Sequence, residues 1–427
     1  MGDEDTRRGS PPAPEGAPVP GRFDYDAAPV SATLPARLLA DRAAVEAFAE
    51  RARASGRVAL DTEFFWERTY VPVLCLVQAA VEDEDEDEVV LIDPLAGVPV
   101  DAIAALVADP AVETVMHAPG GDLLAFAAHF GTRASNVTDT QVLAGFVGLT
   151  ASASLERLLQ AVLGVKPGQH ESFSDWQARP LTEQQLTYAA DDVRSLLALT
   201  DRLRDQLEER GRLAWSSDEL RRRYPDGADV MSEAGDAWRR VQRRNRLSGK
   251  QLAVLREAAA WREELARRRD QPTSWVLKDP TLVEVARIAP VDARTLMRIR
   301  GMPKGLAGSD QEALLEAVER GRHADPVQLP KAPSASVQHR LDAASGLAAT
   351  LIRVRCAADD VATELVATRV EADAYIRRVL LGEDAGDLLL GSGWRLELVG
   401  DEIRELCRGN VGLSVSDTSP WIEISRR

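Results

Sequence analysis

The chain has 427 residues, enough for two to four domains of about 100 to 200 residues each. Its 45% hydrophobic and 28% charged residues exclude a collagenous, wholly disordered or disulfide-stapled chain. Three cysteines fit neither a zinc site nor a disulfide framework. The apolar runs are shorter than the roughly 18 residues of a membrane span, and the N-terminus lacks the apolar stretch of a signal peptide. We therefore expect a cytoplasmic protein with no membrane partner.

The net charge of -16 is unevenly distributed along the chain. Residues 238–324 contain 19 Arg and Lys against 11 Asp and Glu, a net charge of +8, so the remainder carries -24. Phosphate binding draws its energy from clustered Arg and Lys. The basic region is therefore where contacts to nucleic acid are expected.

The N-terminal half predicts a tail and one α/β domain. Residues 1–31, rich in Pro, Gly, Ala and acidic residues without periodicity, are predicted to be a disordered tail, and the domain is predicted to span residues 32–224. Thr182 with Gln185 predicts the start of a long helix. Strands are expected at 58–64, 74–81, 89–93 and 114–118, and helical patterns occur at 41–54, near 100–108 and 122–130, and over most of 139–223.

Two all-helical domains are predicted to follow. A linker at 225–236 precedes a domain over residues 237–325, in which apolar residues recur at helical spacing. A second linker, at 326–336, has Pro, Ala and Ser composition. The final domain, residues 337–427, is mostly helical in pattern up to about Arg408.

Asp61 and Glu63 are the first residues that point to chemistry. Side chains alternate along a strand, so both carboxylates lie on the same side of it. Burying two such acids is costly unless a cation compensates, but a bare acid pair on a solvated strand face is common. Asp122 begins a predicted helix, where a carboxylate can serve simply as an N-cap.

Tyr188 and Asp192 are four residues apart and share one face of a predicted helix. Asp191 is about 100° away from that face and is expected to be the exposed member of the pair.

Taken together, the acids offer four hard oxygen donors, a set that suits two Mg²⁺ or Mn²⁺ ions rather than zinc. Two such ions about 3.5 to 4 Å apart stabilise the attacking and leaving oxygens of a phosphoryl displacement, and Tyr188 is placed to orient the attacking water. A glycosidase explains the set less well because it needs only two carboxylates. The four donors are Asp61, Glu63, Asp122 and Asp192.

These residues stand in segments that resemble the DEDD superfamily of 3′-to-5′ exonucleases, and within it the ribonuclease D family. Several ordered motifs over about 190 residues make the resemblance specific. The motifs are Leu60-Asp61-Thr62-Glu63-Phe64 with the following Tyr70-x-Pro72-x-Leu74-x-Leu76-x-Gln78, His117-Ala118-x3-Asp122-Leu123, and Tyr188-Ala189-Ala190-x-Asp192-Val193. Between them, Asp139-Thr140-Gln141 and Ser174-Asp175-Trp176-x2-Arg179-Pro180 also match.

The resemblance implies a ribonuclease H-like fold, a mixed sheet flanked by helices, in which the four acids bind two divalent cations and Tyr188 positions the nucleophilic water. Thr187 stands where the histidine subgroup has its His, which places the chain in the tyrosine subgroup. The implied activity is 3′-to-5′ hydrolysis of the terminal phosphodiesters of RNA, releasing nucleoside 5′-monophosphates. The implied substrates are tRNA precursors and small structured RNAs, and the implied state is a monomer.

Residues 237–325 resemble the HRDC domain, through Leu247-Ser-x-Lys250-Gln251-Leu252 and Ala260-Trp261-Arg262. Arginine-rich patches fit phosphate contacts, although a charge run is more often a solvated face. The final domain resembles a second, weaker HRDC-like domain, with Trp394 expected as a core anchor. The RNA-binding candidates are Arg239, Arg240, Arg243, Arg244, Lys250, Arg267 and Arg268.

Neighbouring residues carry weaker expectations. Phe64 alternates away from the acids and is expected in the core, and Trp66 fits either the core or stacking on a terminal nucleotide. His117 is expected to fix the turn before Asp122. The acidic run at 82–88 is expected to be a solvated hairpin loop.

Two other functions remain open from the sequence. One is a DNA 3′-to-5′ exonuclease, because a metal site of this kind does not read the 2′-hydroxyl. The other is a non-catalytic RNA-binding module, against which the four intact acids argue.

Overall fold

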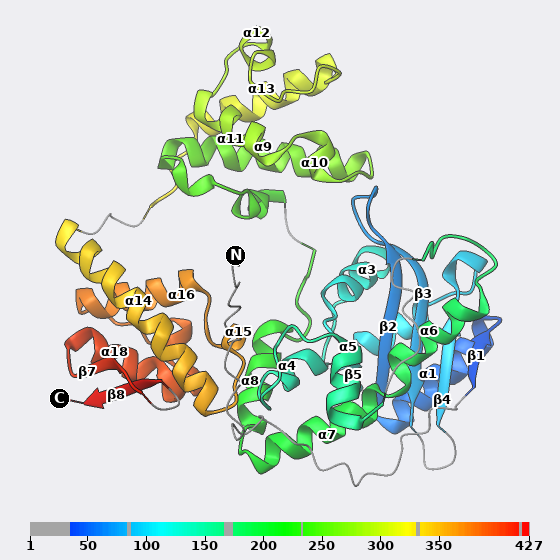
Figure 1. Ribbon diagram of the computed structural model, residues 1–427. Helices are drawn as coiled ribbons and strands as arrows, with labels where there is room; N and C mark the ends of the chain where they lie inside the picture. Colours follow the sequence, from blue (N-terminus) through cyan, green and yellow to red (C-terminus); the bar gives the residue numbers. More distant parts are fainter. Residues whose placement is uncertain are drawn as a thin grey trace, which may run out of the picture.

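The computed structural model describes residues 35–82, 87–165, 174–231, 234–329, 334–417 and 421–426. The predicted tail at 1–31 and the middle of the acidic run therefore lie outside the described residues. Figure 1 shows three bodies in chain order. We refer to them as the sheet domain (residues 35–224), the middle domain (234–323) and the C-terminal domain (334–426).

One six-stranded mixed sheet forms the centre of the sheet domain, in the order β1-β4-β3-β2-β5-β6. The β2–β3 and β3–β4 pairs are antiparallel and the other three pairs are parallel. The strands are β1 (Ala36–Leu39), β2 (Arg57–Phe65), β3 (Val73–Val81), β4 (Glu88–Ile92), β5 (Glu113–Met116) and β6 (Val137–Asp139). The four predicted strands are confirmed, whereas β1 and β6 were not predicted; β6 has only three residues, too few to show alternation.

Helices cover both faces of this sheet. Phe48 of α1, Ile103 of α2 and Phe126 of α3 are buried in one core cluster on one face, and α6 and α7 cover the other. The helices are α1 (Arg42–Ser55), α2 (Asp101–Val107), α3 (Gly120–Phe130), α4 (Thr140–Ala144), α5 (Leu155–Leu158), α6 (Glu183–Arg194), α7 (Leu196–Glu209) and α8 (Leu213–Arg223), with short turns η1 (Pro94–Ala96) and η2 (Leu159–Leu163).

The start of α6 confirms the predicted helix start, because Thr182 and Gln185 form a reciprocal capping box. The helix is shorter than predicted, however. It ends at Arg194, and α7 begins after Ser195, whose backbone leaves the helical conformation. This break separates α6, which carries Tyr188 and Asp192, from the rest of the helical region.

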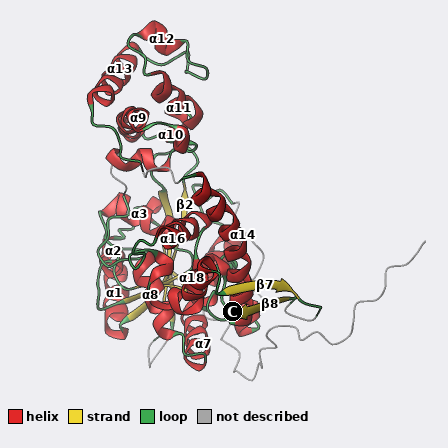
Figure 2. Ribbon diagram, turned by 90° about the vertical axis from the view of Figure 1, so that its left-hand side faces the viewer, coloured by secondary structure: helices red, strands yellow, loops and turns green. Residues whose placement is uncertain are grey.

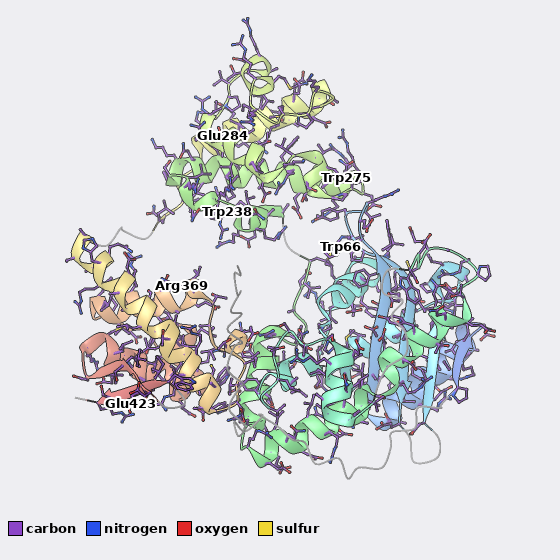
Figure 3. The ribbon with its side chains drawn as sticks, in the orientation of Figure 1. Trp66, Trp238, Trp275, Glu284, Arg369 and Glu423 are labelled. Atoms are coloured by element: carbon purple, nitrogen blue, oxygen red, sulfur yellow. The ribbon has the colours of Figure 1, made fainter. Side chains whose placement is uncertain are left out.

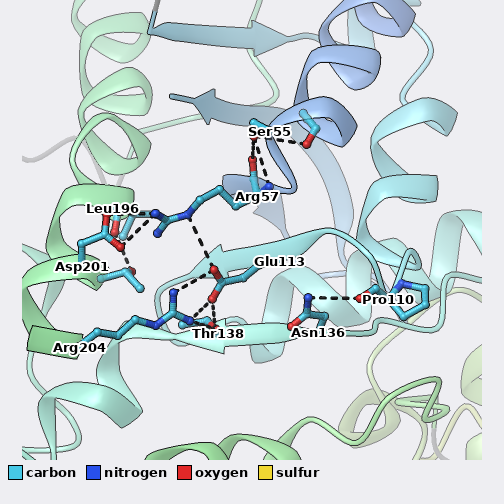
Figure 4. Close-up of polar contacts among 11 residues, drawn as sticks. Ser55, Arg57, Pro110, Glu113, Asn136, Thr138, Leu196, Asp201 and Arg204 are labelled. Atoms are coloured by element: carbon cyan, nitrogen blue, oxygen red, sulfur yellow. Dashed lines mark hydrogen bonds and ion pairs between the residues drawn. The ribbon is translucent and has the colours of Figure 1, made fainter. Parts of the chain in front are cut away.

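A partly buried charge network ties the first residue of β2 to neighbouring elements (Figure 4). The Arg57 guanidinium donates to Asp201 of α7 at 3.0 Å and lies 3.8 Å from Glu113 of β5. Glu113 in turn accepts hydrogen bonds from Arg204 of α7 and from the Thr138 hydroxyl of β6. The strand that carries Asp61 is thereby fixed to the helix that follows α6.

The middle domain is helical throughout its described residues. Its long helix α9 packs against α13 so closely that a Cβ on Gly321 would lie 2.5 Å from the Val254 Cα atom. The elements are η3 (Ala234–Arg240), η4 (Arg244–Arg246), α9 (Gly249–Arg268), α10 (Thr273–Val276), α11 (Asp279–Ile288), α12 (Ala293–Met297) and α13 (Gly308–His323).

The C-terminal domain corrects the prediction that it is all helical. A β-hairpin follows its last helix (Figure 2). One face of the hairpin packs against the apolar core through Val411, Leu413 and Ile424, and the other face is exposed. The elements are α14 (Ala335–Ala358), α15 (Thr363–Val366), α16 (Arg369–Leu381), η5 (Leu389–Gly391), α17 (Gly393–Arg395), η6 (Leu396–Gly400), α18 (Asp401–Arg408), β7 (Val411–Val415) and β8 (Ile422–Arg426).

The C-terminal domain and the sheet domain share one hydrophobic core. The Trp394 ring stacks on Trp215 of α8, with centroids 5.5 Å apart, and meets Phe146 edge-on at 5.0 Å. Trp394 is 3% exposed, which confirms its prediction as a core anchor.

The middle domain contacts the sheet domain through Tyr70, in the connection between β2 and β3. The Tyr70 hydroxyl donates to Glu263 at 2.8 Å, and its backbone N–H donates to Asp270 at 3.0 Å. The Arg267 guanidinium lies 5.5 Å above the Tyr70 ring. Figure 3 shows Trp66 in the same connection, on the side nearest the middle domain.

Two expectations about the chain as a whole can be compared with this fold. In the part that the structure describes, no helix is long and apolar enough to cross a membrane. All three cysteines are free, with Cys75 and Cys356 buried and Cys407 half-buried.

Candidate active site

Three predicted acids converge between β2 and α6. Asp61 and Glu63 project from the same face of β2, and Asp192 reaches them from α6, which covers that face. One carboxylate oxygen from each lies within 4.8 Å of the other two. Among the described residues this is the one cluster of metal-ligating side chains found. All its donors are carboxylate oxygens, which suit hard divalent cations.

Asp122 lies outside this tight group of three, and its buried carboxylate is held by Thr62. The Thr62 hydroxyl donates to Asp122 at 2.5 Å from the face of β2 opposite to Asp61 and Glu63. Asp122 is still close enough for its charge to act on both of those acids. Thr62 was not identified as a site residue from the sequence. Its position between the two acids of the first motif was the signal that could have indicated this role.

The electrostatics of the site disfavour four negative charges without a cation. Burial, followed by the charges of Asp122 and Asp192, raises the pKa of Asp61 well above its usual value. Burial and the same two neighbours raise the pKa of Glu63 to about 8. Burial raises the pKa of Asp122 to about 6 in spite of the hydrogen bond from Thr62. A bound cation would stabilise the ionised forms of all three.

The turn before Asp122 is held by a hydrogen-bond network. Ala118, in the left-handed region at φ 52°, donates its backbone N–H to the Asp139 carboxylate at 2.9 Å. The His117 Nδ1 atom lies 2.8 Å from the Thr140 hydroxyl, and burial lowers the pKa of His117. These contacts support the expectation that His117 fixes the turn, and they give Asp139 a role that the sequence left open.

Phe64 also positions the start of α3. A bulge in the β2–β3 ladder falls between Glu63 and Phe64. The Phe64 ring then lies over Gly121, where an added Cβ would come within 2.4 Å of the ring. Phe64 is half-buried, whereas the sequence predicted it to be a core residue. Its ring can lie in this position because Gly121, the residue before Asp122, has no side chain.

Tyr188 is half-buried beside the acids. Burial, followed by the charges of Asp192, Glu63 and Asp61, raises its pKa, so the hydroxyl keeps its proton at neutral pH. Its ring centroid lies 6.1 Å from that of Trp176. The neighbouring Asp191 was expected to be exposed; its side chain is in fact only 25% exposed, because it pairs with Arg194 one turn along α6.

Arg179 anchors the segment that leads into α6. Its guanidinium makes a two-pronged contact with Asp93, with N–O distances of 2.6 and 2.7 Å. It also donates to the carbonyl oxygens of Cys75 and Trp176, each at 2.8 Å. Arg179 therefore fixes Trp176, and through it the Tyr188 ring, to the sheet.

Four of the seven RNA-binding candidates already contact other side chains of the protein. These contacts are Arg239 with Asp236, Arg240 with Glu263, Arg267 with Tyr70, and Arg268 with Asp310. All seven are exposed, and the other three, Arg243, Arg244 and Lys250, form no ion pair among the described residues. These three are therefore the better candidates for phosphate contacts, because a guanidinium already engaged by another side chain of the protein is less available to a phosphate.

Comparison with known proteins agrees with this geometry. A family model described as 3′-5′ exonuclease matches residues 37–208, and the HRDC domain model matches residues 251–318. Ribonuclease D of Acidiphilium cryptum is 36% identical over 376 residues, which cover 87% of this chain and 93% of that protein. Ribonuclease D of Gluconacetobacter diazotrophicus is 38% identical over 372 residues, which cover 86% and 92%.

A solved structure is also similar over most of the chain. The crystal structure of Escherichia coli RNase D, an exoribonuclease involved in structured RNA processing, matches with a TM-score of 0.71 and 30% identity. The match covers 88% of this chain and 99% of that one.

The mixed sheet, its acid cluster and these matches define a 3′-to-5′ exoribonuclease with an HRDC domain. The chain belongs to the ribonuclease D family. The non-catalytic RNA-binding module is therefore not supported. One HRDC domain is matched, and a second HRDC-like domain at the C-terminus remains a prediction.

Proposed function

We propose that this exoribonuclease uses two divalent cations, Mg²⁺ or Mn²⁺, held by Asp61, Glu63, Asp122 and Asp192. The supporting observation is the convergence of three of these carboxylates within 4.8 Å, with Asp122 close beside them. When bound, two such cations activate water and stabilise the charge on the leaving oxygen of a phosphodiester. The donor set fits these ions, because it contains only carboxylates and their charges disfavour the cation-free state.

The protein's own groups have separate roles in this proposal. Tyr188 keeps its hydroxyl proton, so it donates a hydrogen bond that orients the water approaching the terminal phosphodiester. Thr62 and the turn around Ala118 hold Asp122 in place. Hydrolysis at the 3′ end then releases one nucleoside 5′-monophosphate and leaves an RNA shorter by one nucleotide.

We also propose that the substrates are structured RNAs with a 3′ extension, such as tRNA precursors, bound by a monomer. The net charge of +8 over residues 238–324 supports RNA contacts by the middle domain. The role in structured RNA processing stated for the Escherichia coli protein points the same way.

A trimming assay tests the proposal. A tRNA with an extended 3′ tail is incubated with wild type and Asp61→Asn in Mg²⁺, Mn²⁺ or EDTA, and products are resolved one nucleotide at a time. We expect stepwise shortening that requires the metal and is lost in the variant. Shortening that persists in EDTA or in Asp61→Asn would contradict the proposed site, and a matched DNA oligomer tests the preference for RNA.

A further inference from the structure

Gln78 lies in the middle of β3, directly across the ladder from Asp61. Its side chain is fully buried, with 0% exposure. Neither Nε2 nor Oε1 of its amide has a hydrogen-bond partner among the described residues. A buried amide with unpaired donors and acceptors costs free energy, and such a group in a folded protein needs an explanation.

The ladder fixes the face on which this amide lies. Directly opposed residues of antiparallel strands have side chains on the same face, with Cβ atoms about 4.5 to 5.5 Å apart. On the other side of β3, Gln78 is opposed by Leu91 of β4, which is apolar. The helix above this face contributes Ala189 to the same cluster as Leu91. Asp61 is therefore the polar side chain that the ladder sets beside the amide.

We propose that Gln78 is a positioning residue for Asp61, whose amide N–H donates a hydrogen bond to the Asp61 carboxylate in the metal-loaded protein. This inference rests on the proposed function, because it concerns Asp61 as a metal ligand. An ionised carboxylate is a strong acceptor for such a donor. Residues that orient metal ligands in this way commonly change metal affinity about 10- to 100-fold when they are removed.

A neighbouring strand of the same sheet supplies a matched control. Thr114 of β5 is also 0% exposed, and its hydroxyl has no partner among the described residues. It pairs with Val58, three residues from Asp61 and therefore on the opposite face of β2. Thr114 is thus a buried unpaired polar group on the face of the sheet opposite to Asp61 and Glu63.

The test measures Mn²⁺ binding by calorimetry without RNA. We expect Gln78→Met, which nearly conserves volume, to weaken Mn²⁺ binding about 10- to 100-fold. Its metal-free melting temperature should equal or exceed that of wild type, because a buried unpaired amide is removed. The Mn²⁺ concentration for half-maximal trimming should rise by a similar factor, with the rate restored at saturating Mn²⁺. Thr114→Val should leave Mn²⁺ binding unchanged.

The other outcomes overturn the proposal. Equal Mn²⁺ affinity in wild type and Gln78→Met would show that the amide does not act on Asp61. Weaker binding together with a lower metal-free melting temperature would assign Gln78 to the fold instead. If Gln78→Met does not fold, Gln78→Leu provides the same comparison. Wild type that binds no Mn²⁺ would instead remove the metal site on which the proposed function depends.

Discussion

Arg395 and Glu219 form an ion pair although they are 176 residues apart in the chain. The Arg395 Nη2 atom lies 2.5 Å from a Glu219 oxygen, and their side chains are 5% and 0% exposed. Arg395 also donates to the carbonyl oxygens of Leu365 and Val366. This buried pair joins the C-terminal domain to α8, beside the stacked Trp394 and Trp215 rings.

Glu219→Gln should strongly destabilise the protein. The change leaves three guanidinium groups, those of Arg222, Arg223 and Arg395, without their shared carboxylate. Removing one partner from a buried pair typically costs about 3 to 5 kcal/mol. Thermal unfolding should show a lower melting temperature. The control is Asp218→Asn, which breaks an exposed pair with Arg221 one position away and should cost about 1 kcal/mol or less. Equal effects of the two changes would contradict a structural role for the pair.

The same carboxylate should make the domain interface sensitive to acid. Burial alone would raise the Glu219 pKa, but hydrogen bonds from Arg222, Arg223 and Arg395 outweigh it and hold the pKa at about 2. A folded pKa below the unfolded value of about 4.3 gives stability that is present above pH 4.3 and is lost as pH falls toward 2. The melting-temperature difference between wild type and Glu219→Gln should therefore shrink below about pH 4.3. A difference that stays constant down to pH 2 would exclude this linkage.

Asp61→Asn should stabilise the metal-free protein while it abolishes trimming. The change removes one of three carboxylates that lie within 4.8 Å of one another, and with it their repulsion. Added Mn²⁺ should raise the melting temperature of wild type. At a free Mn²⁺ concentration of 100 times the dissociation constant, binding adds about 2.7 kcal/mol to the free energy of unfolding. The variant should show a smaller shift or none. Melting curves with EDTA measure the metal-free stability, and curves with Mn²⁺ measure the shift on metal binding. A metal-free melting temperature lower in the variant than in wild type would contradict the proposed repulsion between the carboxylates.

Tyr70→Phe should loosen the contact between the middle domain and the sheet domain. It removes the hydroxyl that donates to Glu263 but keeps the ring under Arg267. Because the middle domain is proposed to bind structured RNA, trimming of a tailed tRNA should fall more than trimming of a short single-stranded oligonucleotide. A double-mutant cycle with Glu263→Gln should give a coupling of about 0.5 to 1.5 kcal/mol in unfolding. If the trimming rates of both RNAs fall equally, the contact between Tyr70 and Glu263 does not influence which RNA is preferred.

The basic residues that form no ion pair in the described structure should contribute more to RNA binding than the paired ones. Arg243→Ala with Lys250→Ala should reduce the salt dependence of RNA binding by about 0.7 per lost phosphate contact. Arg240→Ala should change this slope less, because Arg240 is already paired with Glu263. Binding titrations over a range of salt concentrations measure the slope. A larger change from Arg240→Ala would reverse the assignment.

The sequence by itself determined the local features of the site, because each depends on residues close together in the chain. Strand alternation placed Asp61 and Glu63 on one face, and the spacing of Tyr188 and Asp192 placed them on one face of α6. The start of α6 could be predicted because a capping box is complete within four residues. Length limited the same reasoning, since the three-residue strand β6 has too few positions for a pattern.

Only the tertiary structure decided how these features meet. The Thr62–Asp122 hydrogen bond spans 60 residues and the Arg395–Glu219 pair spans 176, and neither leaves a periodic signal in the sequence. The burial of Gln78 beside Asp61 follows from the register of two strands, which alternation alone does not fix. Local patterns report which way a side chain faces, whereas its partner depends on elements that folding brings together from distant parts of the chain.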